Sequence, residues 1–173
     1  FEEEKTTELI CEKLTGMGIH PLRLDPTGVT AYIGPHDAYT VGLRADIDGL
    51  RVLEDTDLPF QSKHPGKMHA CGHDGHITVG LGTAKILCGM KDQLRGTIKF
   101  IFQPAEEGVR GAKAIVEKGH LDDVDVVLGA HMSGKEDQEQ CMIGIGDGHS
   151  LATTKMDVEF YGKASHAAAA PEA

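Results

Sequence analysis

Three histidines, a cysteine and an aspartate lie within the nine residues MHACGHDGH at positions 68–76. Cys71 and His73 stand two residues apart beside glycine, so both side chains can turn toward one centre. A thiolate and an imidazole together suit Zn or another first-row divalent ion. The same residues also allow a cysteine nucleophile with His69 or His73 as its base, or a histidine-rich loop without chemistry. The spacing favours a metal site and leaves the other two interpretations open.

A pair of carboxylates and a further histidine follow two apolar runs. Glu106 and Glu107 come after the run 97–103, and His131 closes the run 124–132. Neighbouring carboxylates point in different directions, so one can bind metal while the other serves as a general base toward water. Taken alone, the glutamates fit a solvated helix start and the histidine fits an ordinary core residue. Together with the cysteine and histidine above, they predict a hydrolytic metal centre.

The other histidines are given supporting or surface roles. His69 and His76 are interpreted as supporting or loop residues, because too many metal ligands would leave no open position for water. The remainder are interpreted as structural or surface residues: His20, His36, His64, His120 and His149.

Hydrophobic periodicity predicts alternating helices and strands. The expected helices are 2–16, 76–90 and 104–119, and the expected strands are 29–33, 39–44, 97–103 and 124–132. Strand and helix in alternation indicate an α/β fold with a parallel sheet. Ligands of such sheets bind at the carboxyl ends of the strands, where Asp46, Asp48, the two glutamates and His131 are all expected.

Composition restricts the class of partner. The 27 acidic and 17 basic residues leave a formal charge of -10, which argues against nucleic acid or an anionic membrane as a partner. No apolar run reaches the ~20 residues of a membrane-spanning helix, and the first residues lack a signal-peptide pattern. Four scattered cysteines show no disulfide-scaffold spacing. We therefore expect a cytoplasmic protein.

The pattern changes near residue 152. The stretch TTKMDVEFYG, 153–162, alternates between apolar and polar residues, as in an antiparallel strand. We expect residues 1–152 to form part of a catalytic α/β domain. Residues 153–173 would then be the first strand and loop of a second, incomplete domain.

Five motifs together resemble the metal-dependent amidohydrolase branch of the aminoacylase and carboxypeptidase family. In chain order they are LRADIDGLRV (43–52), MHACGHDGH (68–76), IFQPAEEG (101–108), GAHM (129–132) and GKASHAAAAPE (162–172). That branch includes hippurate hydrolases, N-acyl-amino-acid amidohydrolases and auxin-conjugate hydrolases. Within it, the chain looks most similar to the aminobenzoyl-glutamate utilisation protein A type.

The resemblance implies a site built on two divalent metal ions, Mn or Zn. Its implied ligands are Cys71, His73, Glu107 and His131, with Glu106 as the general base and acid. The implied fold is a zinc-peptidase-like mixed sheet with helices on both faces, followed by the start of a small α+β lid. In this family the lid forms the dimer interface, and a lid histidine reaches the partner subunit's active site; His166 matches that histidine. Family members are longer and carry a further metal-ligating histidine, so the resemblance implies that these 173 residues are a fragment.

The expected function is hydrolysis of the amide bond of an N-acyl or N-aroyl amino acid, such as aminobenzoyl-glutamate. Metal-bound water would attack the carbonyl while Glu106 takes its proton. The expected partners are a small-molecule substrate and a second subunit, in a homodimer or hetero-oligomer formed through the lid. Two alternatives remain: a cysteine-nucleophile hydrolase, and a non-catalytic metal-binding subunit.

Overall fold

The computed structural model describes residues 1–36, 39–108, 110–133, 143–145, 156, 158–162 and 168. The chain divides into two units, Phe1–Glu136 and Asp137–Ala173, and every helix and strand of the described residues lies in the first. The domain boundary expected at residue 152 stays a prediction, because residues 146–155 lie outside the described residues.

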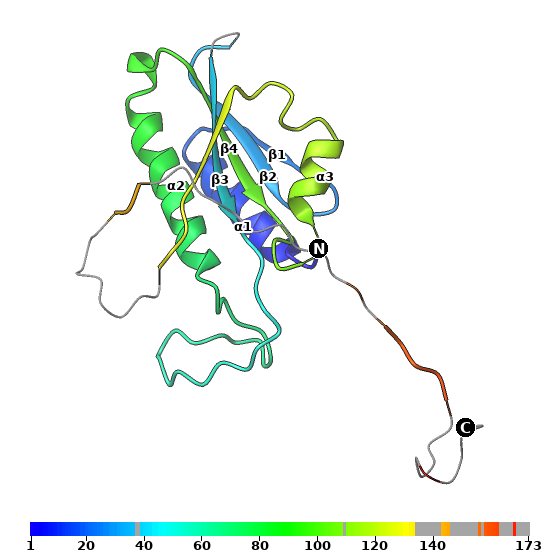
Figure 1. The fold of residues 1–173 in the computed structure, drawn as a ribbon. Helices are drawn as coiled ribbons and strands as arrows, with labels where there is room; N and C mark the ends of the chain where they lie inside the picture. The colour runs from blue at the N-terminus through cyan, green and yellow to red at the C-terminus, as the bar shows by residue number, and fades with distance from the viewer. Residues whose placement is uncertain are drawn as a thin grey trace. The chain divides into compact units, whose positions relative to one another are not determined.

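The first unit is built on a mixed sheet of five strands in the order β1-β2-β4-β3-β5 (Figure 1). Strands β3, β4 and β5 are parallel, whereas β1 and β2 run antiparallel to their neighbours. The elements in chain order are α1 (Glu4–Gly16), β1 (Pro21–Arg23), β2 (Val29–Ile33), β3 (Thr40–Asp46), α2 (His73–Gly89), a short 3-10 helix (Lys91–Gln93), β4 (Thr97–Gln103), α3 (Gly111–Glu117) and β5 (Val126–Gly129).

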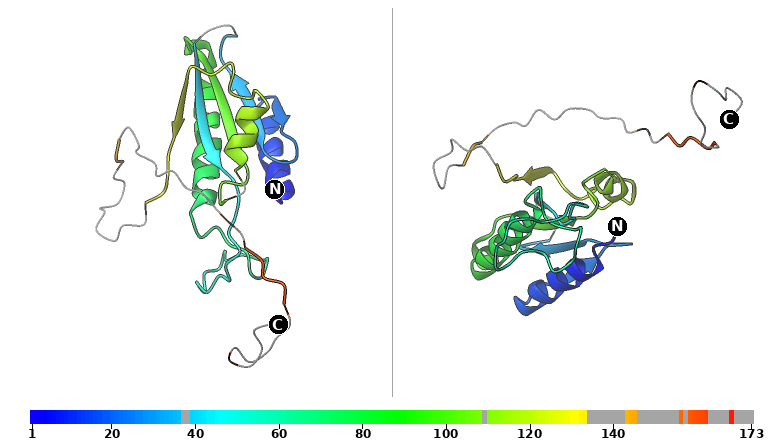
Figure 2. Two further views of the ribbon diagram at one scale, coloured as in Figure 1. Left: turned by 45° about the vertical axis from the view of Figure 1, so that its right-hand side comes forward. Right: turned by 90° about the horizontal axis from the view of Figure 1, so that it is seen from below.

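Helices cover both faces of the sheet, as Figure 2 shows. Helices α1 and α2 pack on one face, over a core whose largest fully buried members are Phe100, Phe102, Ile10, Leu14 and Ile47. Helix α3 packs on the opposite face, where Ile115 meets Leu24 and Ile101. Phe100, Ile101 and Phe102 alternate between the faces because successive strand residues point to opposite sides. The predicted α/β fold with a mixed sheet and helices on both faces is confirmed.

The strand register brings the carboxyl ends of the three parallel strands to one edge. Asp46, the last residue of β3, pairs with Gln103, the last residue of β4. Arg44 pairs with Gly129 at the end of β5. His131 follows Gly129 by two residues, so it leaves the sheet at the level of Asp46. This edge is where the candidate residues were expected.

Several helices and strands differ from the sequence-based expectations. Helix α2 begins at His73, three residues earlier than expected, so His73 lies in the first turn of a helix. Helix α3 is limited to Gly111–Glu117, because residues 106–108 form a turn and Ala105 and Arg110 have positive φ. Strand β1 was not predicted, since three residues are too few to show a period.

Strand β5 and the described residues of the run 153–162 also differ from expectation. The apolar run that forms β5 suggested a buried strand, but its four residues are exposed at the edge of the sheet. In the expected strand 153–162, the described residues 156 and 158–162 form no strand. A strand needs a hydrogen-bonded neighbour, and none is found for them within the described part of the chain. No helix among the described residues is both long and apolar enough to cross a membrane.

Candidate metal centre

His73 presents one ring nitrogen to the site. Gly72 precedes α2 with φ 85°, a left-handed conformation that glycine adopts without strain and that turns the chain into the helix. The imidazole is 1% exposed, and its Nδ1 donates a hydrogen bond to the carbonyl oxygen of Asp48 at 3.0 Å. Its Nε2 is buried and has no hydrogen-bond partner among the described residues. A buried imidazole with its second nitrogen held by a carbonyl is the usual arrangement of a metal-binding histidine.

Cys71 and His131 meet although 60 residues separate them. The Cys71 Sγ atom lies 3.5 Å from His131 Nε2. His131 Nδ1 donates to the carbonyl oxygen of Met132 at 2.7 Å, so Nε2 carries the lone pair. Together with His73, these side chains offer three ligand atoms that lie within 4.8 Å of one another.

The two glutamates complete a second group around the same histidine. His73, Glu106 and Glu107 also offer ligand atoms within 4.8 Å of one another, and Glu107 Oε1 lies 3.9 Å from His73 Nε2. Asp48 positions this group, because its Oδ2 accepts the backbone N–H of Glu107 at 2.9 Å. Asp48 also accepts the hydrogen bond of His73 through its carbonyl oxygen. This single residue, which follows β3, therefore orients both the histidine on α2 and the glutamate after β4.

The surroundings of Cys71 disfavour a free thiolate. The pKa of the Cys71 thiol is raised to about 11, and burial is the largest cause. A hydrogen bond with Glu107 and the negative charges of Glu107, Glu106 and Asp46 raise it further. In the absence of a cation the thiol is therefore protonated at neutral pH and is a weak nucleophile. A soft thiol, two imidazole lone pairs and a carboxylate fit a first-row divalent ion. The donor set fits a metal better than it fits a cysteine nucleophile.

A buried ionic group lies beneath these ligands. Asp46 is 1% exposed, and its Oδ2 lies 2.7 Å from Arg44 Nη1. Its Oδ1 accepts a short hydrogen bond from His76 Nδ1. Burial acts to raise the pKa of Asp46, but the His76 hydrogen bond and the charges of Arg44 and His73 outweigh it and lower the pKa. Asp46 is therefore a carboxylate at neutral pH.

The structure brings together most of the side chains expected from the sequence. Cys71, His73, Glu106, Glu107 and His131 converge at the carboxyl edge of the sheet, whereas His166 lies outside the described residues. The sequence placed Asp46 and Asp48 at the same edge but assigned them no role. Their position directly after an apolar run was the available signal. Their partners depend on contacts between distant residues.

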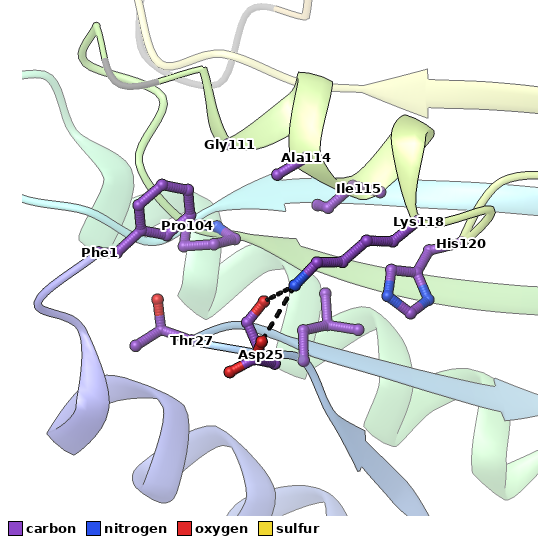
Figure 3. A pocket seen from close by; sticks show the side chains of 10 residues that line it. Phe1, Asp25, Thr27, Pro104, Gly111, Ala114, Ile115, Lys118 and His120 are labelled. Atoms are coloured by element: carbon purple, nitrogen blue, oxygen red, sulfur yellow. Dashed lines mark hydrogen bonds and ion pairs between the residues drawn. The ribbon is translucent and has the colours of Figure 1, made fainter.

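A separate pocket lies between the β1–β2 turn and α3 (Figure 3). Lys118 lines it and donates to the carbonyl oxygen of Asp25 at 2.5 Å and to its Oδ2 at 3.2 Å. The lining residues are Phe1, Leu24, Asp25, Thr27, Pro104, Gly111, Ala114, Ile115, Lys118 and His120. They include none of the candidate ligands, so this pocket is separate from the candidate metal centre.

Comparison with known proteins gives the family. The model of peptidase family M20/M25/M40 matches residues 42–173. The chain belongs to this family. It is 42% identical over 176 residues to an IAA-amino acid hydrolase of Arabidopsis thaliana, covering 97% of this chain and 39% of the relative. It is also 42% identical over 172 residues to an N-acyl-L-amino acid amidohydrolase of Geobacillus stearothermophilus, covering 97% of this chain and 46% of the relative.

Solved structures of the M20 family agree with the fold. The YXEP protein of Bacillus subtilis, a dinuclear metal binding peptidase, superposes with a TM-score of 0.73 at 44% identity, covering 76% of this chain and 37% of YXEP. An aminobenzoyl-glutamate utilisation protein from Klebsiella pneumoniae gives a TM-score of 0.58 at 27% identity, covering 76% of this chain and 39% of that protein. The amidohydrolase branch is therefore supported, but the narrower resemblance to aminobenzoyl-glutamate utilisation proteins is not. The chain spans less than half the length of these relatives.

Proposed function

We propose that the protein containing this chain hydrolyses the amide bond of N-acyl amino acids in a metal-dependent reaction. The observation that carries the proposal is the convergence of Cys71 and His131 beside the unpartnered Nε2 of buried His73. The amidohydrolases that it resembles support the substrate class. Indole-3-acetyl and simple acyl conjugates are proposed ahead of aminobenzoyl-glutamate, because the relatives with such names have the higher identity.

Cys71, His73, Glu107 and His131 are the proposed ligands. Cys71 and His131 form one group of potential ligands with His73, and Glu107 belongs to a second group that also contains His73. Bound divalent ions supply Lewis acidity, which lowers the pKa of water and polarises a carbonyl. Two ions, Mn or Zn, are proposed because YXEP is a dinuclear metal binding peptidase.

Glu106 is the proposed general base. It is exposed beside Glu107, so its carboxylate can face substrate while its neighbour faces His73. Glu106 would take a proton from the attacking water as the C–O bond forms. It would return that proton to the amine nitrogen as the C–N bond breaks. The products are a carboxylic acid and a free amino acid.

His166 and the second subunit stay part of the proposal by resemblance alone. His166 would donate a hydrogen bond to the substrate carbonyl oxygen in the partner subunit's site, where charge develops during attack. The homodimer or hetero-oligomer and the lid domain are proposed on the same basis. The cytoplasmic location expected from the sequence stays a proposal as well.

The test uses the full-length protein, stripped of metal and then supplied with Mn or Zn. A panel of N-acetyl, N-benzoyl, indole-3-acetyl and aminobenzoyl amino acids should be hydrolysed only by the metal-loaded form. Hydrolysis that survives chelator and is abolished by thiol alkylation would instead establish a cysteine nucleophile. Stoichiometric metal binding without turnover of any of these substrates would establish a non-catalytic metal-binding protein.

A further inference from the structure

Both ring nitrogens of His76 are engaged within the protein. His76 is 4% exposed and lies in the first turn of α2, where it contacts the segment that follows β5. Its Nε2 accepts the backbone N–H of Met132 at 2.8 Å, so the ring proton resides on Nδ1. That proton is donated to Asp46 Oδ1. Although Asp46, His73 and His76 form a third group of potential ligands, His76 has no lone pair left for a metal.

Asp46 is itself anchored to the sheet. Arg44 lies 2.7 Å from Asp46 Oδ2 through Nη1, and its Nε donates to Gln103 Oε1 at 2.9 Å. The chain of contacts therefore runs from the ends of β3 and β4 through Asp46 to His76, and from His76 to the backbone of Met132. A carboxylate that holds the Nδ1 proton of an imidazole fixes both its tautomer and its ring orientation.

The Met132 side chain packs directly against two glycines, Gly72 and Gly75. A Cβ atom added to Gly75 would lie 3.2 Å from Met132 Cγ, and one added to Gly72 would lie 3.1 Å from Met132 Cβ. Both distances are shorter than ordinary carbon contacts. A side chain at either position would force Met132 to shift by a few tenths of an ångström, so the two glycines favour this close approach to the first turn of α2.

The segment docked in this way carries His131. Strand β5 ends at Gly129. Among the described residues 131–133 that follow, the backbone is joined to α2 by the hydrogen bond from the Met132 N–H to His76. The rings of His76 and His131 lie 4.6 Å apart between centroids, and His131 Nε2 lies 3.5 Å from Cys71 Sγ. The placement of one proposed ligand thus depends on a residue that binds no metal.

We infer that His76 is a positioning residue that holds the Met132 backbone and thereby presents His131 to Cys71. This inference rests on the proposed function for the role of His131. The docking itself is a property of the chain without metal. It also requires residue 75 to leave room for the Met132 side chain.

The experiment compares four variants of the full-length protein, with cobalt(II) as the probe. His76→Phe keeps a ring but removes both nitrogens, whereas His76→Gln keeps a donor and an acceptor. Gly75→Leu places a side chain where Met132 packs against α2. Gly82→Leu is its matched control on α2, because nothing lies within 4 Å of a Cβ added at Gly82. Cobalt affinity and the thiolate-to-cobalt absorption band are measured by titration of the metal-free proteins.

His76→Phe and Gly75→Leu should each weaken cobalt binding by about tenfold or more and alter the absorption band. His76→Gln and Gly82→Leu should stay close to wild type. Wild-type affinity and an unchanged band in both His76→Phe and Gly75→Leu would overturn the inference. If His76→Phe does not fold, Gly75→Leu against Gly82→Leu decides the question alone.

Amide hydrogen exchange separates this inference from the proposed function. In the metal-free protein the Met132 amide should be protected, and that protection should be lost in His76→Phe and Gly75→Leu. If wild type bound no cobalt, the proposed function would fail, and the exchange result would still decide the docking. A Met132 amide that exchanges equally in wild type and both variants would overturn the inference.

Discussion

The side chain of Glu3 accepts a hydrogen bond from the backbone N–H of Ala105 at 3.2 Å, across 102 residues of sequence. Ala105 has a positive φ of 50° and immediately precedes Glu106. Its carbonyl oxygen accepts the N–H of Gly111 at 3.0 Å, so both of its backbone polar groups are held. The residue before α1 therefore stabilises a left-handed turn from which the proposed general base projects.

Replacing Glu3 with alanine should destabilise the fold by about 1–3 kcal/mol, because the buried amide of Ala105 loses its acceptor. Thr27 loses its acceptor as well, since its hydroxyl donates to Glu3 Oε2 at 2.7 Å. Glu3→Gln retains an acceptor oxygen and should lose less. Urea unfolding of both variants measures the difference. Equal losses for the two substitutions would show that the hydrogen bond to Ala105 contributes little.

Gly28 should tolerate no side chain. Its φ is 103°, and an added Cβ would lie 2.8 Å from Pro104 Cδ and 2.9 Å from the Phe102 carbonyl oxygen. Gly18 is a matched control, with φ 75° and nothing within 4 Å of an added Cβ. Both alanine variants incur the cost of positive φ, about 1–2 kcal/mol. Gly28→Ala should lose further stability from the clash, as measured by thermal unfolding, and equal losses would contradict the close approach.

The Lys99–Asp123 pair should make stability depend on pH. Lys99 is 2% exposed, and its Nζ donates to Asp123 Oδ1 at 2.5 Å and to the carbonyl oxygen of His120. Burial acts to raise the pKa of Asp123, but hydrogen bonds from Lys99 and Tyr32 outweigh it and lower the pKa.

Because the folded-state pKa of Asp123 is lowered, its stabilising contribution is fully present above the unfolded value of about 3.9. It is lost as pH falls through the lower, folded-state pKa. Asp123→Asn should therefore be less stable than wild type at pH 7, and the difference should shrink progressively below about pH 4. Urea unfolding across this pH range provides the measurement. A difference that stays constant throughout would exclude the pair as its source.

Glu106→Gln should strongly reduce turnover but leave metal binding intact. The amide cannot accept a proton at neutral pH, so kcat should fall by about 10²–10⁴. Metal content and the thermal midpoint should match wild type, since the Glu106 side chain is exposed and its removal disturbs no packing. Glu107→Gln is the contrasting variant, because loss of a proposed ligand should lower metal content. Near-normal turnover in Glu106→Gln would remove Glu106 from the mechanism.

Zinc should stabilise the metal-free protein, because an ion that binds only the folded state shifts the unfolding equilibrium. At a free zinc concentration 100 times Kd the expected gain is about 2.7 kcal/mol. Calorimetry with and without zinc measures it, and Cys71→Ser should reduce the shift. Cys88→Ser is the control, because Cys88 lies among apolar residues on the far part of α2. An equal zinc effect in both cysteine variants would argue against Cys71 as a ligand.

The local pattern of the sequence determined most of the secondary structure and the types of side chain at the site. The runs 29–33 and 97–103 match β2 and β4 in full, because strand periodicity and apolar character are properties of a few adjacent residues. Cys71 and His73 could be identified together because only one residue separates them. Helix α2 begins earlier than its apolar pattern because Gly72, rather than a side-chain cap, turns the chain into it.

Tertiary structure decided which of these residues act together. No spacing in the sequence indicates that β4 lies between β2 and β3, that Asp48 holds both His73 and Glu107, or that His76 accepts the amide of Met132. Each of these contacts joins residues more than 20 positions apart. They form only when strand register and helix packing bring the segments to one edge of the sheet. The conformational entropy that the chain loses is offset by the apolar surface that the whole unit buries on folding.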